Sequence, residues 1–425
     1  GDKLLEVKKV VLKSVEEKRG EILGLLRELV QTPSVTGSER EVQEKISQKL
    51  EQMDLKVDVW CPSIDELKEH KAYNPLDTDY KDRPNVVGLY KGVGGGRSLI
   101  LNGHADVVTP DDQKWTYDPW SAKVVDGKVY GRGACDMKGG LTSIIMALKC
   151  IKDANVELLG DVIIESVIGE ETGGNGTLAC IMRGYKADAG IVAEPTGLEI
   201  HTMQSGALWF RISVTGRAAH GAFRKAGISA LEKIVRIYET LLEFENKRMK
   251  ELRHPLYEEK YGMLPVYVNI GVLRAGEWPS TVPDRAFLEG RVGLLPEEDC
   301  DVIKGQVEEL IMKVSSEDSW LKENPPKIEW LGRWDPAKID ISHPLVSTVK
   351  EAYTTITGKE AVLGGTVGGT DMRLLTLYGD TPSILFGPGN IDLAHTADEY
   401  IDLEDVITAT KVIACTIVDW CGVNI

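Results

Sequence analysis

Apolar and charged positions follow a helical period at the start of the chain. Residues 2–30 are apolar at about every third or fourth position and charged in between, which predicts an amphipathic helix. The turn TPSVTGSE, residues 32–39, leads into a second helix expected over 39–52, with Ser38 as its candidate N-cap. Leu55–Trp60 then alternates between apolar and polar side chains, as a half-buried strand does.

Short apolar runs and helical segments alternate from residue 98 to the middle of the chain. Ser98–Asn102, Asp161–Ile168 and Ala189–Val192 are apolar runs of strand length. A strongly periodic helix opens at Gly139, and another helical segment covers 176–184. This parallel α/β pattern predicts a catalytic domain of the α/β class, with a mixed sheet flanked by helices.

The order of elements changes near residue 205. From there the pattern predicts β-α-β-β-α-β, at Ala207–Thr215, Gly227–Phe244, Val266–Leu273, Arg285–Leu294, Glu298–Ser315 and Lys327–Leu331. This is the order of a ferredoxin-like α+β domain, which could stand alone as an insertion. The α/β pattern then resumes, with elements expected at 344–357, 382–386 and 402–420. We therefore predict an α/β domain formed by 1–205 and 335–425, interrupted by an inserted domain over 206–334.

Two polar segments have no predicted helix or strand. Residues 61–84 are rich in Pro and Asp and are expected to form a surface loop. The cluster GVGGGR, residues 92–97, could be proposed as a phosphate cradle. It precedes a strand instead of joining a strand to a helix, so a hairpin turn is the better interpretation.

Composition and charge narrow the class of protein. With 425 residues, 42% hydrophobic and 27% charged, the chain has the profile of a soluble globular protein of two domains. Its net charge of −16 argues against a nucleic-acid partner. No run approaches the ~20 apolar residues of a membrane span, and the N-terminus has no signal-peptide core. The seven cysteines form no CxxC pair, which favours a reducing compartment and a cytoplasmic protein.

The candidate chemistry centres on Asp136, in the stretch VYGRGACDMKGG over residues 129–140. This carboxylate lies at a strand-to-helix junction, where α/β proteins usually bind ligands. The neighbouring Cys135 raises the alternative of a thiol nucleophile. We do not favour it, because no histidine lies nearby in the sequence.

Further candidates lie where two of the predicted strands end. His104 ends one strand, and Asp106 two residues later could accept a hydrogen bond from its imidazole, as carboxylates do beside metal-bound histidines. The alternative is a histidine satisfied by a neighbouring carbonyl. Glu170 and Glu171 lie side by side after the next strand, so one could bind a metal while the other acts as a general base. The alternative there is a solvated acidic turn.

Glu194 and His395 complete the set, although each alone is an unremarkable loop residue. One histidine, one shared aspartate and one glutamate would hold a first metal ion. The same aspartate with a second glutamate and histidine would hold another. Together these residues predict a two-metal hydrolytic site.

Two other positions could contact the substrate. His220 follows the first strand of the inserted domain and could donate a hydrogen bond to an oxyanion, although a structural role is equally open. The glycine-rich segment 364–373 contains Gly369, Thr370 and Arg373, which could receive a substrate carboxylate. The alternative for this segment is a flexible hinge.

The set of motifs resembles the acetylornithine deacetylase and succinyl-diaminopimelate desuccinylase family of dinuclear zinc amidohydrolases, in the clan of aminoacylase and carboxypeptidase G. The matching stretches run in the family order across nearly the whole chain: GHADVV (103–108), VYGRGACDMKGG (129–140), GEETGG (169–174), VAEPTG (192–197), VTGRAAHGA (214–222), GGTDMR (368–373) and AHTADEY (394–400).

The resemblance implies a zinc-peptidase-like catalytic domain and a role for each candidate. His104, Asp136 and Glu194 are expected to bind one zinc. Asp136, Glu171 and His395 are expected to bind the other.

Further roles follow from the same resemblance. Glu170 is the implied general base, and Asp106 is expected to orient His104. His220 is expected to reach the active site of a partner subunit, in a homodimer formed through the inserted lid domain. A cis peptide bond is implied between Asp136 and Met137.

The predicted function is metal-dependent hydrolysis of the amide bond of a small N-acyl amino acid or amine, through a metal-bridging water with Glu170 as general base. Two Zn²⁺ ions are the expected cofactors, with Co²⁺ or Mn²⁺ as alternatives. The rival interpretations are a di- or aminopeptidase of the same clan, a deformylase of an N-formylaminopyrimidine, and an inactive metal-binding relative. One departure concerns Ser280, which stands where many relatives carry a substrate-contacting asparagine in the lid.

Overall fold

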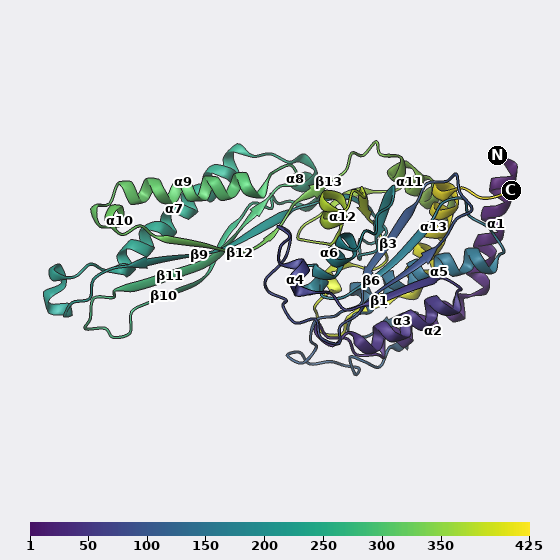
Figure 1. Cartoon of the computed structure of the whole chain (residues 1–425), viewed down its shortest axis with the longest axis horizontal. Coiled ribbons are helices and arrows are strands. Elements are labelled where there is room, and N and C mark those ends of the chain that lie inside the picture. Colours follow the sequence, from purple (N-terminus) through teal and green to yellow (C-terminus); the bar gives the residue numbers. More distant parts are fainter. The chain divides into compact units, whose positions relative to one another are not determined.

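The computed structural model describes residues 1–425, which divide into two compact units. Unit 1 comprises Gly1–Met203, Lys338–Thr366 and Thr370–Ile425. Unit 2 comprises Gln204–Ala337 and Val367–Gly369 and carries the labels β9–β12 and α7–α10 in Figure 1. A role for unit 2 as a lid remains a prediction.

A nine-stranded mixed sheet forms the centre of unit 1. Its order is β1-β2-β6-β3-β7-β15-β8-β13, and β14 pairs with β8. The strands are β1 (Lys56–Trp60), β2 (Asn85–Tyr90), β3 (Leu99–His104), β6 (Val162–Val167), β7 (Ala189–Val192), β8 (Ile200–Gln204), β13 (Ala337–Lys338), β14 (Leu363–Thr366) and β15 (Ser383–Leu385). Strand β3 runs parallel to both of its neighbours, β6 and β7. The carboxyl ends of these three strands therefore lie side by side at one edge of the sheet.

Helices cover both faces of this sheet (Figure 1). On one face the core includes residues of α1 (Asp2–Glu17), α2 (Arg19–Val30), α3 (Arg40–Gln52), α5 (Gly139–Asp153), α11 (Pro344–Thr357) and α13 (Leu403–Cys421). On the other face lie α4 (Ile64–Leu67), α6 (Asn175–Met182) and α12 (Met372–Tyr378). Alternate residues of β6 enter the two cores, Ile164 one and Ile163 the other, because successive side chains of a strand point to opposite faces. The predicted α/β class with a mixed sheet flanked by helices is confirmed.

A small second sheet joins two distant parts of the chain. Its strands are β4 (Lys123–Val125), β5 (Lys128–Tyr130) and β16 (Tyr400–Asp402), in the order β16-β5-β4. Tyr400 lies directly opposite Tyr130 in the antiparallel pair of β16 and β5. The segment that follows β5 is thereby held beside the segment that precedes β16.

Unit 2 contains a four-stranded antiparallel sheet in the order β10-β11-β9-β12. The strands are β9 (Gly206–Thr215), β10 (Val268–Ala275), β11 (Arg285–Leu294) and β12 (Lys327–Trp334). Helices α7 (Ala230–Glu251) and α9 (Cys300–Ser316) pack against it, and α8 (Pro255–Tyr261) and α10 (Ser319–Glu323) are short additions. This is the ferredoxin-like order expected from the sequence.

Two local predictions at the N-terminal side were wrong. The single helix expected over 2–30 is two helices, which meet at Lys18. Ser38 does not cap the next helix, because Glu39 occupies the N-cap position and no side chain caps that end. The apolar period continues across the break at Lys18, so hydrophobicity alone did not reveal it.

The predicted hairpin at 92–97 was also wrong. Strand β6 lies between β2 and β3, so the strands on either side of the glycine cluster do not pair. A Cβ at Gly92 would overlap the carbonyl oxygen of Leu159, and one at Gly96 would overlap that of Cys421. These glycines are explained by close backbone packing.

Residues 61–84 are not the solvated surface loop that their composition suggested. They contain the short helix α4, and the side chains of Asn74, Asp77, Tyr80 and Arg83 are buried. Charged residues can be buried when they are paired, and composition does not reveal such pairing.

No helix of the structure has the length and apolar character that a membrane crossing would require.

Candidate active site

Three adjacent parallel strands deliver four of the candidate residues to one edge of the sheet. His104 is the last residue of β3. Glu170 and Glu171 lie in a single helical turn, η2 (Glu170–Thr172), just after β6. Glu194 follows β7 by two residues. The site therefore lies where parallel sheets usually place ligands.

The small second sheet brings in Asp136 and His395. Asp136 lies in η1 (Ala134–Lys138), at the start of α5, and its peptide bond to Met137 is cis, as the resemblance implied. Nε2 of His395 lies 3.3 Å from Oδ2 of Asp136 and 3.1 Å from Oε1 of Glu171. The side chain of His395 is 52% exposed, so the site is open to solvent on that side.

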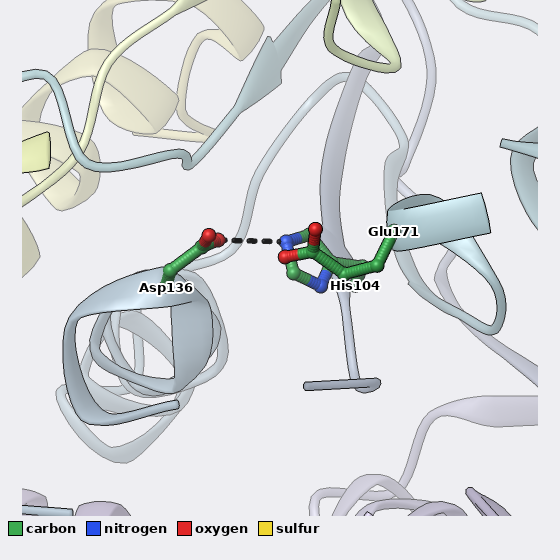
Figure 2. A group of neighbouring side chains, drawn as sticks. All are labelled: His104, Asp136 and Glu171. Carbon is green, nitrogen blue, oxygen red and sulfur yellow. Dashed lines mark hydrogen bonds and ion pairs between the residues drawn. The ribbon is translucent and has the colours of Figure 1, made fainter. Parts of the chain in front are cut away.

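The imidazole of His104 lies at the centre of the carboxylates. Its Nε2 is 3.0 Å from Oδ1 of Asp136 and 3.3 Å from Oε1 of Glu194. Oε2 of Glu170 lies 3.6 Å from the same nitrogen. Figure 2 shows the Asp136 carboxylate directed at His104, with Glu171 approaching from a separate element. Potential ligand atoms lie within 4.8 Å of one another in two triads, His104–Asp136–Glu171 and His104–Glu170–Glu194.

No lysine or arginine balances the charges of this cluster. The carboxylates of Asp136, Glu170, Glu171 and Glu194 make their ion pairs only with His104 and His395. Burial, followed by repulsion from Asp136, raises the pKa of Glu171 to about 8. Burial raises the pKa of Glu194 to about 7, although His104 opposes the shift. Crowded buried carboxylates of this kind favour either bound protons or a bound cation.

Several features fit divalent cations at this position. Oε1 of Glu194 is buried and has no hydrogen-bond partner. Nδ1 of His104 lies 2.8 Å from the main-chain oxygen of Asp106, which leaves Nε2 for a ligand, as is usual for metal-binding histidines. Carboxylate and imidazole donors together suit Zn²⁺, Co²⁺ and Mn²⁺.

Asp106 has a wider set of contacts than the sequence predicted. Its carboxylate lies 3.5 Å from Nδ1 of His104, whereas its main-chain oxygen lies 2.8 Å from the same nitrogen. It accepts hydrogen bonds from the amides of Glu170 and Glu171, both at 3.1 Å, and from the Thr36 hydroxyl at 2.8 Å. Burial opposes its ionisation, but the hydrogen bonds and the charge of His104 hold the pKa of Asp106 below its usual range. Asp106 thus contacts both the histidine and the turn of the glutamates.

Glu399, which the sequence analysis did not single out, links the Asp136 and His395 segments. Its Oε2 accepts hydrogen bonds from the amides of Gly133, Cys135 and Asp136, at 2.9–3.1 Å. Its Oε1 pairs at 2.9 Å with the buried guanidinium of Arg132, which also donates to the main-chain oxygen of Thr396. Both residues fall within the motif stretches 129–140 and 394–400, but only the folded chain shows that they meet.

Glu399→Gln is expected to weaken divalent-cation binding by ~10–100-fold, the usual effect of losing a partner that orients a ligand. Glutamine keeps the shape, but its amide nitrogen cannot accept a hydrogen bond from the Asp136 segment or from Arg132. Titration of the chelated protein with Co²⁺, followed by visible absorption, measures the affinity. Glu404→Gln, at an exposed surface ion pair with Arg19, is the matched control. Equal affinities in both variants would show that Glu399 does not position the site.

The residues predicted to bind substrate are engaged in hydrogen bonds or in packing with other parts of the protein. Arg373 is buried and donates at 2.8 Å to the carbonyls of Thr370 and Gly173. The Thr370 hydroxyl is buried and accepts from the Met372 amide. A Cβ at Gly369 would overlap the Trp334 indole, so packing explains this glycine.

His220 and Cys135 lie in contrasting environments. His220 belongs to unit 2 and is exposed, with Nδ1 accepting from the Ala222 amide at 3.0 Å. The Cys135 thiol is buried and donates to the carbonyl of Asn390. Burial, with repulsion from Glu399, raises the pKa of Cys135 far above its usual value. This is the opposite of what a thiol nucleophile requires.

Comparison with known proteins decides the family. The sequence profile of peptidase family M20/M25/M40 matches residues 100–419. The chain belongs to this family. The predicted family resemblance and the predicted class, an enzyme that hydrolyses amide bonds, are thereby confirmed.

Individual members of the M20 family are similar along most of their length. N-formyl-4-amino-5-aminomethyl-2-methylpyrimidine deformylase of Bacillus subtilis is 30% identical over 435 aligned positions, which cover 96% of this chain and 97% of the relative. A probable succinyl-diaminopimelate desuccinylase of Staphylococcus aureus is 29% identical, over an alignment that covers 72% of this chain and 79% of the relative. The crystal structure of the Bacillus subtilis YxeP protein, described as a dinuclear metal-binding M20 peptidase, has a TM-score of 0.66 at 17% identity, over 96% of this chain and 99% of that one. This last likeness shows a shared fold.

Proposed function

We propose that this M20 chain is a dinuclear metal-dependent amidohydrolase that removes the acyl group from a small N-acyl amine or amino acid. The observation that carries the proposal is the convergence of two imidazoles and four carboxylates with no lysine or arginine paired to them. The names of the deformylase and desuccinylase relatives support the substrate class, because both denote removal of an acyl group.

Two divalent cations, Zn²⁺ by first choice and Co²⁺ or Mn²⁺ as alternatives, would be held by the cluster. His104, Asp136 and Glu194 are the ligands proposed for one. Asp136, Glu171 and His395 are the ligands proposed for the other, with Asp136 shared. When bound, such a pair polarises an amide carbonyl and lowers the pKa of water. The YxeP relative, described as dinuclear, supports two ions in place of one.

Glu170 is the proposed general base. Its carboxyl is buried 3.6 Å from His104, and no Lys or Arg pairs with it. Burial and the charge of Glu194 raise its pKa well above the usual value, which makes its carboxylate a stronger base. Glu170 takes a proton from the attacking water and delivers it to the leaving nitrogen.

His220 is the proposed donor to the oxyanion. Because Nδ1 accepts a hydrogen bond from the Ala222 amide, the neutral imidazole carries its proton on Nε2. That N–H is the group that would donate to the substrate oxygen. The resemblance assigns this histidine to the site of a partner subunit. The homodimer remains a proposal, and sedimentation equilibrium of the purified chain decides it.

The test of this function is hydrolysis of a panel of N-acyl substrates by the zinc-loaded protein, with the chelated protein as control. The panel holds N-acetylornithine, N-succinyl-diaminopimelate, N-acetyl and N-formyl amino acids, several dipeptides and an N-formylaminopyrimidine. We expect turnover of one acyl class, and only in the loaded protein. Cleavage of the dipeptides alone would instead support the peptidase alternative.

A formylated aminopyrimidine is the second candidate within the same chemistry. The similarity to the Bacillus subtilis deformylase supports this candidate, because the alignment extends over nearly the full length of both chains. The bonded state of Arg373 removes one group that was expected to recognise a substrate carboxylate. A substrate without a carboxylate is therefore compatible with this part of the site.

A further inference from the structure

Every residue of the turn that carries Glu170 is held by a buried carboxylate. The Gly169 amide donates to Glu39 at 3.0 Å, and the Thr172 hydroxyl donates to Asp77 at 2.7 Å. Between them, the amides of Glu170 and Glu171 donate to Asp106. Hydrogen bonds from a donor to an ionised carboxylate are roughly twice as strong as those between neutral groups. The turn is thus fixed at successive positions by groups from three other segments.

A single arginine forms ion pairs with two of these carboxylates. Arg83 is buried and makes five hydrogen bonds: Nε and Nη2 donate to Glu39, Nη1 and Nη2 donate to Asp77, and Nη1 also donates to the Asp79 carbonyl. Glu39 is fully buried, and Asp77 is nearly so. The planar fork of arginine matches this bidentate arrangement, which the point charge of lysine does not reproduce.

We propose that Arg83, through Glu39 and Asp77, is a positioning residue for the general base. The segment 61–84 then has a function, because it places Asp77 in contact with the turn 169–172 and Arg83 in contact with Asp77 and Glu39. Its contacts fix the main chain of residues 169–172. The fixed main chain then orients the Glu170 side chain toward the attacking water. This inference rests on the proposed role of Glu170, and a misplacement of about 1 Å at a reacting group can cost ~10²-fold in rate.

Thr172→Val and Arg83→Lys test the proposal, and amide hydrogen exchange of the peptide containing 169–172 is the first readout. Valine keeps the volume of threonine but removes the hydroxyl, which donates to Asp77 at 2.7 Å and more weakly to the Gly169 carbonyl at 3.3 Å. We expect exchange in this peptide to become about ten-fold faster or more, the factor for losing one hydrogen bond to a charged group, while exchange in α13 stays unchanged. This readout needs no substrate, so it separates a failure of this inference from a failure of the proposed function.

Kinetics on the substrate found with the panel supply the second readout. Thr172→Val is expected to lower kcat by about ten-fold and Arg83→Lys by up to ~10²-fold, with KM and the two bound metal ions unchanged. Thr172→Ser, which keeps the hydroxyl, should restore both kcat and slow exchange. Arg40→Lys, at an exposed arginine that pairs with Glu44 and Asp82, is the control for the charge-conserving change.

Two results would overturn the inference. Unchanged exchange of 169–172 in Thr172→Val would mean that Asp77 does not hold the turn. Faster exchange with an unchanged kcat would mean that the order of the turn does not matter for Glu170. If Arg83→Lys fails to fold, comparison of Thr172→Val with Thr172→Ser still decides between these outcomes.

Discussion

Glu170→Gln is expected to lower kcat by at least ~10²-fold while two metal ions remain bound to each chain. Glutamine has the shape of glutamate, but it cannot accept a proton from water at neutral pH. The loss therefore falls on proton transfer, and KM should change little. Stopped-assay kinetics together with metal analysis of the same preparation measure both quantities.

The neighbouring Glu171→Gln is the matched comparison for this variant. Glu171 lies 3.1 Å from His395 and is the proposed ligand, so its substitution should reduce metal affinity as well as rate. Glu170 also lies in a triad with His104 and Glu194 that could hold an ion. If Glu170→Gln lost metal and Glu171→Gln kept it, the roles of the two glutamates would be reversed. Near-normal turnover of Glu170→Gln would remove the general base from the mechanism.

Asp136→Ala is expected to remove both metal ions and to lower turnover by more than the ~10–100-fold caused by loss of an outer partner. Its two oxygens face different histidines: Oδ1 lies 3.0 Å from Nε2 of His104, and Oδ2 lies 3.3 Å from Nε2 of His395. No other carboxylate of the cluster contacts both imidazoles. Metal content by atomic absorption, with circular dichroism to verify the fold, measures the effect.

Asp392→Ala is the control for this prediction. Asp392 is exposed and lies three residues before His395, so its removal should leave both ions and the activity in place. Retention of one ion by Asp136→Ala would show that the carboxylate is not shared. Retention of both ions would show that Asp136 is not a ligand.

The strand-end part of the site could be predicted from the sequence. Apolar runs predicted β3, β6 and β7, and parallel neighbours present their carboxyl ends at a common edge. His104, Glu170 and Glu194 follow directly from that geometry. Asp136 and His395 were also candidates from the sequence, but the resemblance was needed to assign each to a particular metal ion. Their approach in space depends on the pairing of Tyr130 with Tyr400 from distant parts of the chain.

The buried supports of the site could not be predicted from composition. The segment 61–84 has the polar residues of a solvated loop, yet Arg83 and Asp77 are buried because Arg83 pairs with both Asp77 and Glu39. Glu399 lies inside a recognised motif, but its three amide partners are defined only by the folded loop around Asp136. Charge pairing over long sequence separations leaves no periodic signal. The prediction for Arg373 did not anticipate its bonds to main-chain carbonyls, because the position of a carbonyl depends on the folded main chain and not on the residue type.

We propose that this cluster holds two catalytic divalent cations. The decisive measurement is titration of the chelated protein with Zn²⁺, with bound ions counted per chain and turnover followed on the panel substrate. We expect two ions per chain, and hydrolysis that is absent without them and returns as they bind. Hydrolysis that persists in the fully chelated protein would rule out this role, and so would full activity with no ion retained at His104 and Asp136.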